Sequence, residues 1–265
     1  MPIHPTAIVD RRATIDASAD IGPFVVIEGP VDIGPRTRVH AHAVLIGRMI
    51  IGADNVVHAG AVLGDVPQDK SWTDQDCGLR IGERNVFREL SQVHRATKAH
   101  AETVIGSDNY FMTCAHIAHD CRIGNDVILA TGATLGGHVE IADQVFISGN
   151  CVVHQFARIG RLAFLRGLTR TSRDIPPFCI IDGLHTVRAL NRVGLRRAGF
   201  TAAQIRALQR AFVRLFFSRR NLRHAMAELE TEPCTPEVEH LLAFIRASKR
   251  GVAFGPRHRG SSEDD

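Results

Sequence analysis

Four histidines and one aspartate occur at spacings that point to a single chemical site. Asp120 follows His119 directly, and His138 stands eighteen residues beyond Asp120, with His116 and His154 nearby in the chain. An imidazole beside a carboxylate suits general-base chemistry near neutral pH, because the carboxylate fixes the tautomer and stabilises the cation that forms. These residues are therefore candidates for a catalytic groove.

Two other interpretations use the same residues. A histidine on a turn can simply satisfy backbone groups with hydrogen bonds, and three histidines on adjacent repeats can bind zinc. The clustering of four histidines with one aspartate favours a catalytic groove over hydrogen-bonding caps, and the lack of a clear outward-facing histidine trio disfavours zinc. We therefore expect no metal ion.

An aliphatic or aromatic side chain recurs every six residues over about two thirds of the chain. Period six matches neither an α-helix nor a simple strand, and it is typical of a parallel β-helix in which three short strands make a triangular coil of about eighteen residues. Glycines that follow many of these positions mark the turns. The series comprises Ile3, Val9, Ile15, Ile21, Ile27, Ile33, Val39, Leu45, Ile51, Val57 and Leu63, then Ile81, Phe87 and Val93, then Ile105, Phe111, Ile117, Ile123, Leu129, Leu135, Ile141, Ile147, Val153, Ile159 and Leu165.

Spacing in the sequence predicts position on the surface, because residues eighteen apart lie above one another in neighbouring coils. By this spacing the four histidines and Asp120 fall on one side of about three consecutive coils. The period stops at about residues 65–78 and 95–103 and then resumes, which predicts two loops that leave the coil. Loops on a rigid repeat are natural places for function, and the first contains Pro67, Gln68 and Asp69.

Helical spacing replaces the six-residue period in the last third. Thr201 and Gln204 form a capping-box pattern, and Thr235 followed by Pro236 predicts the start of a later helix. The expected organisation is all-β repeat plus α: a hexapeptide β-helix over 1–185, a C-terminal α-helical domain over 186–253, and a disordered tail over 254–265.

Composition narrows the class of protein. The net charge of +4 does not indicate a nucleic-acid partner, and no apolar run is long enough for an integral membrane segment, so we expect a cytoplasmic protein. The six cysteines show no paired spacing and are expected to be reduced thiols. Arginines dominate residues 158–220, where Asp174 and Asp182 are the only acids, so this region should attract an acidic partner.

Several motifs together resemble the family of UDP-N-acetylglucosamine O-acyltransferases of lipid A biosynthesis. They are the segments 3–9, 67–69, 115–121, 136–139, 153–156 and 174–177, together with Gly199 and Phe200, and they span nearly the whole chain. The resemblance implies a left-handed β-helix and a homotrimer with sites between subunits. It also implies transfer of a 3-hydroxyacyl chain from acyl carrier protein to the 3-hydroxyl of the sugar nucleotide, without a metal or cofactor.

The resemblance also implies roles for individual residues. His119 is the general base, Asp120 orients it, and Gly137 offers its backbone N–H to the oxyanion. His116 and His138 line the acceptor site, and Arg166 and Gly167 set the acyl-chain length. Substrate contacts are implied for Asp69, Lys70, His154, Gln155, His185, Asn191 and Arg197.

Departures from the family pattern at three places in the chain concern the substrate and leave the chemistry intact. Ser71 stands where the family has a lysine, Val193 replaces an acidic nucleotide contact, and Ala198 replaces the second of two arginines. The acyl pocket has Arg166 in place of one glycine. Alternatives are therefore a 3-amino or different sugar nucleotide as acceptor, or a non-catalytic hexapeptide scaffold.

Overall fold

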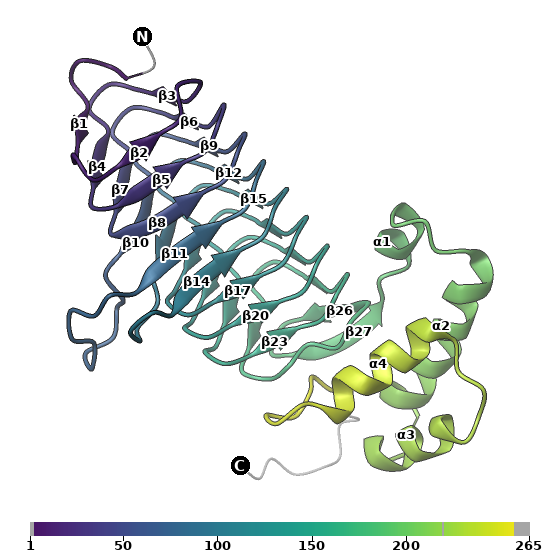
Figure 1. Cartoon of the computed structure of the whole chain (residues 1–265). Helices are drawn as coiled ribbons and strands as arrows, with labels where there is room; N and C mark the ends of the chain where they lie inside the picture. The colour runs from purple at the N-terminus through teal and green to yellow at the C-terminus, as the bar shows by residue number, and fades with distance from the viewer. Residues whose placement is uncertain (1–2, 219, 257–265) are drawn as a thin grey trace.

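Three parallel β-sheets form the sides of a triangular prism, and helices stand at its C-terminal end (Figure 1). The structure is a computed structural model that describes residues 3–218 and 220–256. Until the last two strands, which both join the same sheet, successive strands of the chain join the three sheets in turn, so each sheet takes every third strand. This is the parallel β-helix that the six-residue period predicts.

We number the sheets by the order in which the chain enters them. Sheet 1 contains β1 (Ile8–Val9), β4 (Val26–Glu28), β7 (Val44–Ile46), β10 (Val62–Asp65), β13 (Gln92–His94), β16 (His116–Ile117), β19 (Thr134–Leu135), β22 (Val152–Val153) and β25 (Arg170–Thr171). Sheet 2 contains β2 (Thr14–Ile15), β5 (Val31–Ile33), β8 (Arg48–Ile51), β11 (Gly78–Ile81), β14 (Glu102–Ile105), β17 (Arg122–Ile123), β20 (Glu140–Ile141) and β23 (Arg158–Ile159). Sheet 3 contains β3 (Asp20–Ile21), β6 (Arg38–Val39), β9 (Val56–Val57), β12 (Val86–Phe87), β15 (Tyr110–Phe111), β18 (Ile128–Leu129), β21 (Phe146–Ile147), β24 (Phe164–Leu165), β26 (Cys179–Asp182) and β27 (Thr186–Leu190).

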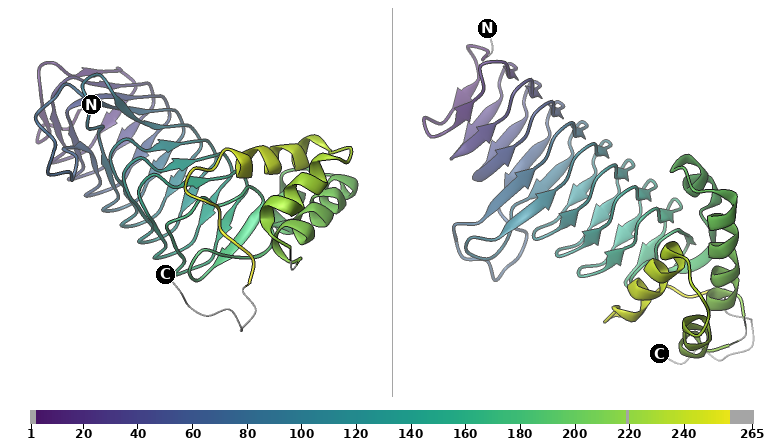
Figure 2. Two further views of the ribbon diagram at one scale, coloured as in Figure 1. Left: turned by 90° about the horizontal axis from the view of Figure 1, so that it is seen from below. Right: turned by 45° about the vertical axis from the view of Figure 1, so that its right-hand side comes forward.

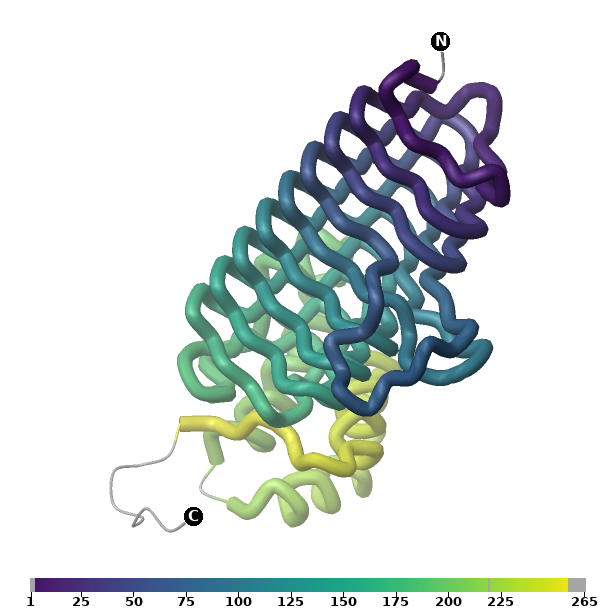
Figure 3. Tube along the Cα trace, turned by 90° about the vertical axis from the view of Figure 1, so that its left-hand side faces the viewer, coloured from purple at the N-terminus to yellow at the C-terminus, as the bar shows by residue number. Residues whose placement is uncertain are grey.

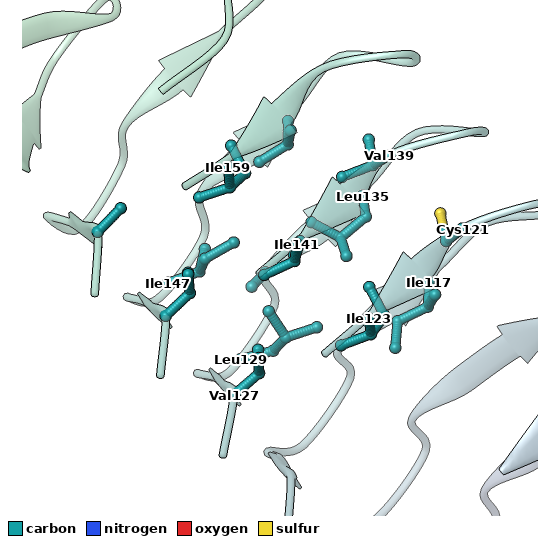
Figure 4. Packing of buried hydrophobic residues seen from close by; sticks show 14 of the residues in the cluster. Ile117, Cys121, Ile123, Val127, Leu129, Leu135, Val139, Ile141, Ile147 and Ile159 are labelled. Carbon is teal, nitrogen blue, oxygen red and sulfur yellow. The ribbon is translucent and has the colours of Figure 1, made fainter. Parts of the chain in front are cut away.

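The residues of the six-residue series fill the inside of the prism. Ile123, Ile141 and Ile159 pair in register across sheet 2, and their side chains lie in one row (Figure 4). Small side chains such as Ala115 and Cys121 are also buried, which leaves room for the larger ones. Each coil therefore buries its apolar side chains against the coils above and below it.

Each corner of the prism is a tight turn that places one residue in the left-handed backbone region. In one coil these residues are Cys114, Asp120 and Asp126, with φ of 58°, 59° and 56°. The turn between sheets 1 and 2, here called corner 1–2, thus fixes the backbone of Asp120, and in the next coil that of His138, with φ of 59°.

Both interruptions of the period leave the prism at corner 1–2, and they lie side by side (Figures 1 and 3). The first connects β10 to β11 and the second connects β13 to β14. Strand partners are eighteen residues apart in most coils, as for Ile117 and Leu135, but thirty apart for Val62 and Gln92. The loops therefore lengthen two coils without disturbing the pairing of the strands.

Four helices follow the last coils: α1 (Arg192–Arg197), α2 (Ala202–Phe216), α3 (Leu222–Glu230) and α4 (Pro236–Arg246) (Figure 2). The capping box at Thr201 and Gln204 is present, with both reciprocal hydrogen bonds, and Pro236 occupies the first turn of α4. Among the helices of the described residues, none has the length and apolar character needed to cross a bilayer.

Two boundaries differ from the organisation expected from sequence. Thr186–Leu190 form β27, which pairs antiparallel with β26, so the helices begin only at Arg192. Val187 is buried and extends the core, which explains why this segment continues the sheet. Phe254 forms a bridge with Thr186, so the expected tail over 254–265 starts with paired backbone, and its residues 257–265 lie outside those the structure describes.

Candidate active site

His119 and Asp120 form a hydrogen-bonded pair at corner 1–2. His119 Nδ1 lies 2.8 Å from Asp120 Oδ2, and the His119 side chain is buried. The left-handed backbone of Asp120 allows its carboxylate to reach its neighbour in the chain. Because Asp120 accepts the Nδ1 proton, Nε2 of His119 is the nitrogen available to receive a proton.

The second loop holds Asp120 in place. Thr97 donates to Asp120 Oδ2 through its hydroxyl at 2.7 Å and through its backbone N–H at 3.2 Å, while Thr103 Oγ1 accepts the Asp120 N–H at 2.8 Å. Burial by itself would raise the pKa of Asp120, but hydrogen bonds from His119 and Thr97 outweigh it and hold the pKa below its usual range. Asp120 is therefore a carboxylate at neutral pH.

Gly137 packs directly against the His119 ring. A Cβ at this position would lie 2.4 Å from Cε1 and 2.7 Å from Nε2 of His119, closer than real contacts allow. Within the part of the chain that the structure describes, the Gly137 N–H donates to no protein acceptor. The glycine thus leaves space for the imidazole and has an unused donor in the site.

His138 lies one coil further along and contacts both Asp120 and the His119 ring, whose centroid is 5.3 Å from its own. Its Nε2 is 3.7 Å from Asp120 Oδ2, and its ring stacks on Phe156 with centroids 4.5 Å apart and a 6° angle between the planes. Burial lowers the pKa of His138. The carboxylates of Asp120 and Asp69 partly oppose this shift by raising the pKa. His138 is therefore neutral near pH 7 and can exchange hydrogen bonds with an acceptor substrate.

His116 lines the same face from β16 and lies in a more buried setting. Burial, together with the charges of His94 and His119, lowers its pKa to about 4. The His94 ring lies 5.2 Å from the His116 ring, and His94 Nδ1 lies 2.7 Å from the carbonyl oxygen of Val66. His94 thus connects the histidine face, formed by His116, His119 and His138, to the first loop. Its sequence position does not suggest this role.

Asp69 reaches the site from the first loop. Hydrogen bonds from the backbone and the hydroxyl of Ser71 hold the pKa of Asp69 below its usual range, and the charges of His119 and His138 contribute to this shift. Ser71 therefore fixes the Asp69 carboxylate, with both bonds at 2.8 Å, whereas Lys70 is exposed.

The two loops are tied together, so Asp69 and Thr97 belong to one unit. The Arg95 guanidinium lies over the Trp72 ring at 5.4 Å, and the Ala99 N–H donates to the Gln75 side chain at 2.8 Å. A movement of either loop would therefore disturb both Asp69 and the support of the His119–Asp120 pair.

Asn191 and Arg197 lie in another part of the structure, away from His119. Both line a cavity of about 580 Å³ between α1 and the outer face of sheet 3, whereas His119 lies at corner 1–2. Asn191 also caps α1, since its side chain accepts from the Gly194 N–H at 3.0 Å. One chain does not bring these residues to His119.

The remaining predicted substrate contacts lie near the C-terminal coils. His154 and Gln155 are exposed at corner 1–2, next to Phe156. His185 is at the turn between β26 and β27 and lines a second cavity of about 720 Å³. His154 and Gln155 are therefore neighbours of the histidine face, and His185 lies further along the prism.

The residues predicted to set acyl length lie at the corner between sheets 3 and 1. Arg166 turns outward and donates to Asp182 Oδ2 at 2.9 Å. A Cβ at Gly167 would have its nearest heavy atom, the carbonyl oxygen of Gly149, 3.7 Å away. The Arg166 guanidinium therefore does not occupy the space beside Gly167.

Comparisons with known proteins place nearly the whole chain in one family. A family model for domain 2 of UDP N-acetylglucosamine O-acyltransferases matches residues 174–253, and a model of bacterial transferase hexapeptide repeats matches residues 102–137. A relative from Anaeromyxobacter dehalogenans, named acyl-(acyl-carrier-protein)–UDP-N-acetylglucosamine O-acyltransferase, is 42% identical over 255 residues, which cover 95% of this chain and 99% of the relative. The chain belongs to this O-acyltransferase family.

Other members show the same relationship. The relative from Syntrophobacter fumaroxidans is 44% identical over 257 residues, covering 95% of this chain and 99% of its own. The crystal structure of the Francisella novicida UDP-N-acetylglucosamine acyltransferase superposes with a TM-score of 0.91 at 32% identity, covering 96% of this chain and 94% of that one. The Moraxella catarrhalis enzyme gives a TM-score of 0.89 at 34% identity, with 96% and 100% covered.

This member of the O-acyltransferase family also has three potential metal ligands close together. One donor atom each from His119, Asp120 and His138 lies within 4.8 Å of the others. However, Asp120 Oδ2 already accepts from His119 and from the Thr97 hydroxyl. The arrangement therefore fits proton transfer through a supported imidazole better than metal binding.

Proposed function

We propose that the protein transfers a 3-hydroxyacyl chain from acyl carrier protein to the 3-hydroxyl of UDP-N-acetylglucosamine, the first step of lipid A biosynthesis. The observation that carries this proposal is the buried His119–Asp120 pair packed on Gly137, with a free Nε2 and an unused backbone donor. Such a pair supplies the two elements that acyl transfer from a thioester needs: a base and an oxyanion donor.

The proposed reaction proceeds in two proton-coupled steps. His119 Nε2 takes the proton of the sugar 3-hydroxyl while that oxygen attacks the thioester carbonyl carbon, and Asp120 stabilises the imidazolium. The Gly137 N–H stabilises the oxyanion of the tetrahedral intermediate. Collapse then breaks the carbon–sulfur bond, and His119 returns its proton to the leaving thiolate, giving the sugar ester and free carrier thiol.

The acceptor side of the site is proposed from the residues around this pair. His116 and His138 are neutral near pH 7 and line the acceptor pocket, and Asp69, fixed by Ser71, contacts the sugar. Lys70, His154, Gln155 and His185 provide further contacts to the substrate. Val193 is exposed in the α1 cavity and offers no charge to a nucleotide base there, which favours testing more than one acceptor.

We propose a homotrimer because the site is incomplete in one chain. Asn191 and Arg197 face the cavity on sheet 3, away from corner 1–2, so they reach a histidine face only on a neighbouring copy. Light scattering should give a mass three times the 29.0 kDa of the chain. A monomer at working concentration would contradict the shared site.

The test of the proposed function is a product assay with matched variants. Wild-type protein, 3-hydroxyacyl carrier protein and UDP-N-acetylglucosamine should give the O-acylated sugar nucleotide by mass spectrometry. The His119→Ala variant should lose about 10²- to 10⁴-fold in rate while keeping the wild-type melting temperature. Near wild-type turnover in this variant would refute His119 as the base.

The acceptor and the carrier are tested in the same format. A 3-amino sugar nucleotide and other nucleotide sugars serve as competing acceptors, and faster acylation of one of them would replace UDP-N-acetylglucosamine as the substrate. The acidic carrier protein is proposed to dock on the arginine-rich C-terminal third, so its apparent affinity should fall as salt rises. An affinity that does not respond to salt would exclude this surface.

A further inference from the structure

A C-terminal strap, residues 248–254, crosses the last coils and brings an arginine to corner 1–2. Asp174 and Val252 form a bridge, as do Thr186 and Phe254, and the Ser248 hydroxyl donates to the buried Asp174 carboxylate at 2.8 Å. The strap is thus built into the surface beside the coil that carries His154 and Gln155.

Arg250 of the strap contacts both predicted substrate residues at that corner. Its Nη1 donates to the Gln155 carbonyl oxygen at 2.6 Å, its Nη2 lies 3.3 Å from His154 Nδ1, and its Nε donates to the Ser172 carbonyl oxygen at 3.1 Å. All three acceptors are neutral when His154 is neutral. The guanidinium is therefore held in one orientation without a compensating negative charge.

Arg173 adds a second positive charge to the same cavity. Both arginines line the opening of about 720 Å³ together with Ser172, His185 and Thr186. Within residues 3–218 and 220–256, neither Arg173 nor Arg250 forms an ion pair, and the nearby Asp182 pairs with Arg166 and Arg188. Two uncompensated guanidinium groups beside a hydroxyl form a site for an anion.

The anion site adjoins the histidine face. Arg250 donates a hydrogen bond to the carbonyl oxygen of Gln155, and the next residue, Phe156, stacks on His138 at 4.5 Å. His138 in turn contacts Asp120. A ligand that reaches both the cavity and His119 would therefore carry a negative charge at some distance from its reacting group. Phosphate esters on a flexible or extended substrate meet this requirement.

We infer that Arg173 and Arg250 form a phosphate-ester subsite of the acyl-transfer site. The existence of the anion site stands on the cavity and its two arginines, whereas the identity of the phosphate rests on the proposed function. Both proposed substrates carry a phosphate ester. The sugar nucleotide has a diphosphate, and the 4′-phosphopantetheine arm of acyl carrier protein, here called the carrier arm, has a phosphodiester. The guanidinium forks suit either group, because both present paired phosphate oxygens.

The experiment compares ligands that differ by their phosphate. Isothermal titration measures the affinity for inorganic pyrophosphate, for UDP against uridine, and for 4′-phosphopantetheine against pantetheine. The proteins are wild type, Arg173→Gln, Arg250→Gln and the control Arg223→Gln, which removes the same charge from an exposed position on α3. Loss of one charge-assisted contact should weaken pyrophosphate about tenfold to hundredfold in the two site variants and leave it unchanged in the control.

The two ester pairs then identify the source of the phosphate. If the site variants lose affinity only for UDP, the subsite belongs to the sugar nucleotide. If they lose affinity only for 4′-phosphopantetheine, it belongs to the carrier arm. Uridine and pantetheine affinities should not change. Pyrophosphate that binds the site variants as it binds wild type, or that does not bind wild type at all, would overturn the inference.

Folding and function are controlled separately. Arg250 holds the strap through carbonyl oxygens, so Arg250→Gln is accompanied by a melting curve. Among the described residues the Arg173 side chain makes no hydrogen bond, and its guanidinium lies over the Phe254 ring of the strap at 5.8 Å. Arg173→Gln is therefore the second variant and is also accompanied by a melting curve. The wild-type protein could bind pyrophosphate through both arginines and yet form no acylated product. That outcome would support the anion site and refute the proposed reaction.

Discussion

A single methyl group at Gly137 should displace His119, the proposed base. In Gly137→Ala the new Cβ would lie 2.4 Å from Cε1 of His119, and ordinary contact begins at about 3.4 Å. The ring must therefore retreat by about 1 Å from a position that it keeps through its 2.8 Å hydrogen bond to Asp120. The Gly137 backbone lies outside the left-handed region and alanine keeps its N–H, so neither the fold nor the oxyanion donor is lost.

The size of the effect follows from this displacement. Misplacing a catalytic group by about 1 Å can reduce the rate by about 10²-fold. That corresponds to about 2.7 kcal/mol in the activation free energy. We therefore expect kcat of Gly137→Ala to fall about 10²-fold with the melting temperature unchanged within a few degrees, as measured by single-turnover acyl transfer and by calorimetry.

A double-mutant cycle shows whether the methyl group acts through His119. In a His119→Ala background there is no ring to displace, so adding Gly137→Ala should change the residual rate by less than about twofold. An equal loss in both backgrounds would mean that the methyl group blocks the substrate. A kcat of Gly137→Ala within threefold of wild type would refute the steric argument itself.

Four other substitutions test separate parts of the structure. Thr97→Val removes the hydroxyl that supports Asp120, so the rate should fall about tenfold and the acid limb of the pH–rate profile should move to higher pH, with Thr97→Ser restoring both. The stability that Asp120 contributes is present above its unfolded pKa of about 3.9 and is lost as pH falls through its lower folded pKa, so Asp120→Asn should leave the pH dependence of stability unchanged above about pH 5. Asn85→Ala breaks a buried ladder of side-chain amides and should lower the free energy of unfolding by about 3 kcal/mol in a denaturant titration; a loss below about 1 kcal/mol would contradict the ladder's role. Gly167→Met should shift selectivity toward acyl chains several carbons shorter in a competition between carrier proteins, and an unchanged chain-length profile would remove Gly167 from this role.

The fold could be predicted from sequence because the β-helix repeats one local pattern. A residue such as Ile117 has the same environment as Leu135 in the next coil, so burial appears as a simple six-residue period. The same period places His138 above Asp120, which the structure confirms with a distance of 3.7 Å. Periodicity thus predicts both the core and the relative positions of residues on one corner.

The supports of the site could not be predicted in the same way. Thr97 lies where the period stops, and a stopped period shows where the chain leaves the coil but not where the loop returns. Arg250 is 95 residues from Gln155 in sequence, and only the path of the strap brings them together. The contact between Gly137 and His119 depends on side-chain rotation, which spacing does not determine.

The ends of the prism have a consequence for association between chains. Each sheet stops at an edge strand, and an unpaired edge can recruit a strand from another molecule. At the start of the prism the edges β1, β2 and β3 are two residues long, which limits what they can pair with. At the other end the antiparallel strand β27 and helix α2 cover sheet 3. A chain cut before Asp174 would expose all three sheets at once, so the C-terminal region also protects the protein against end-to-end polymerisation.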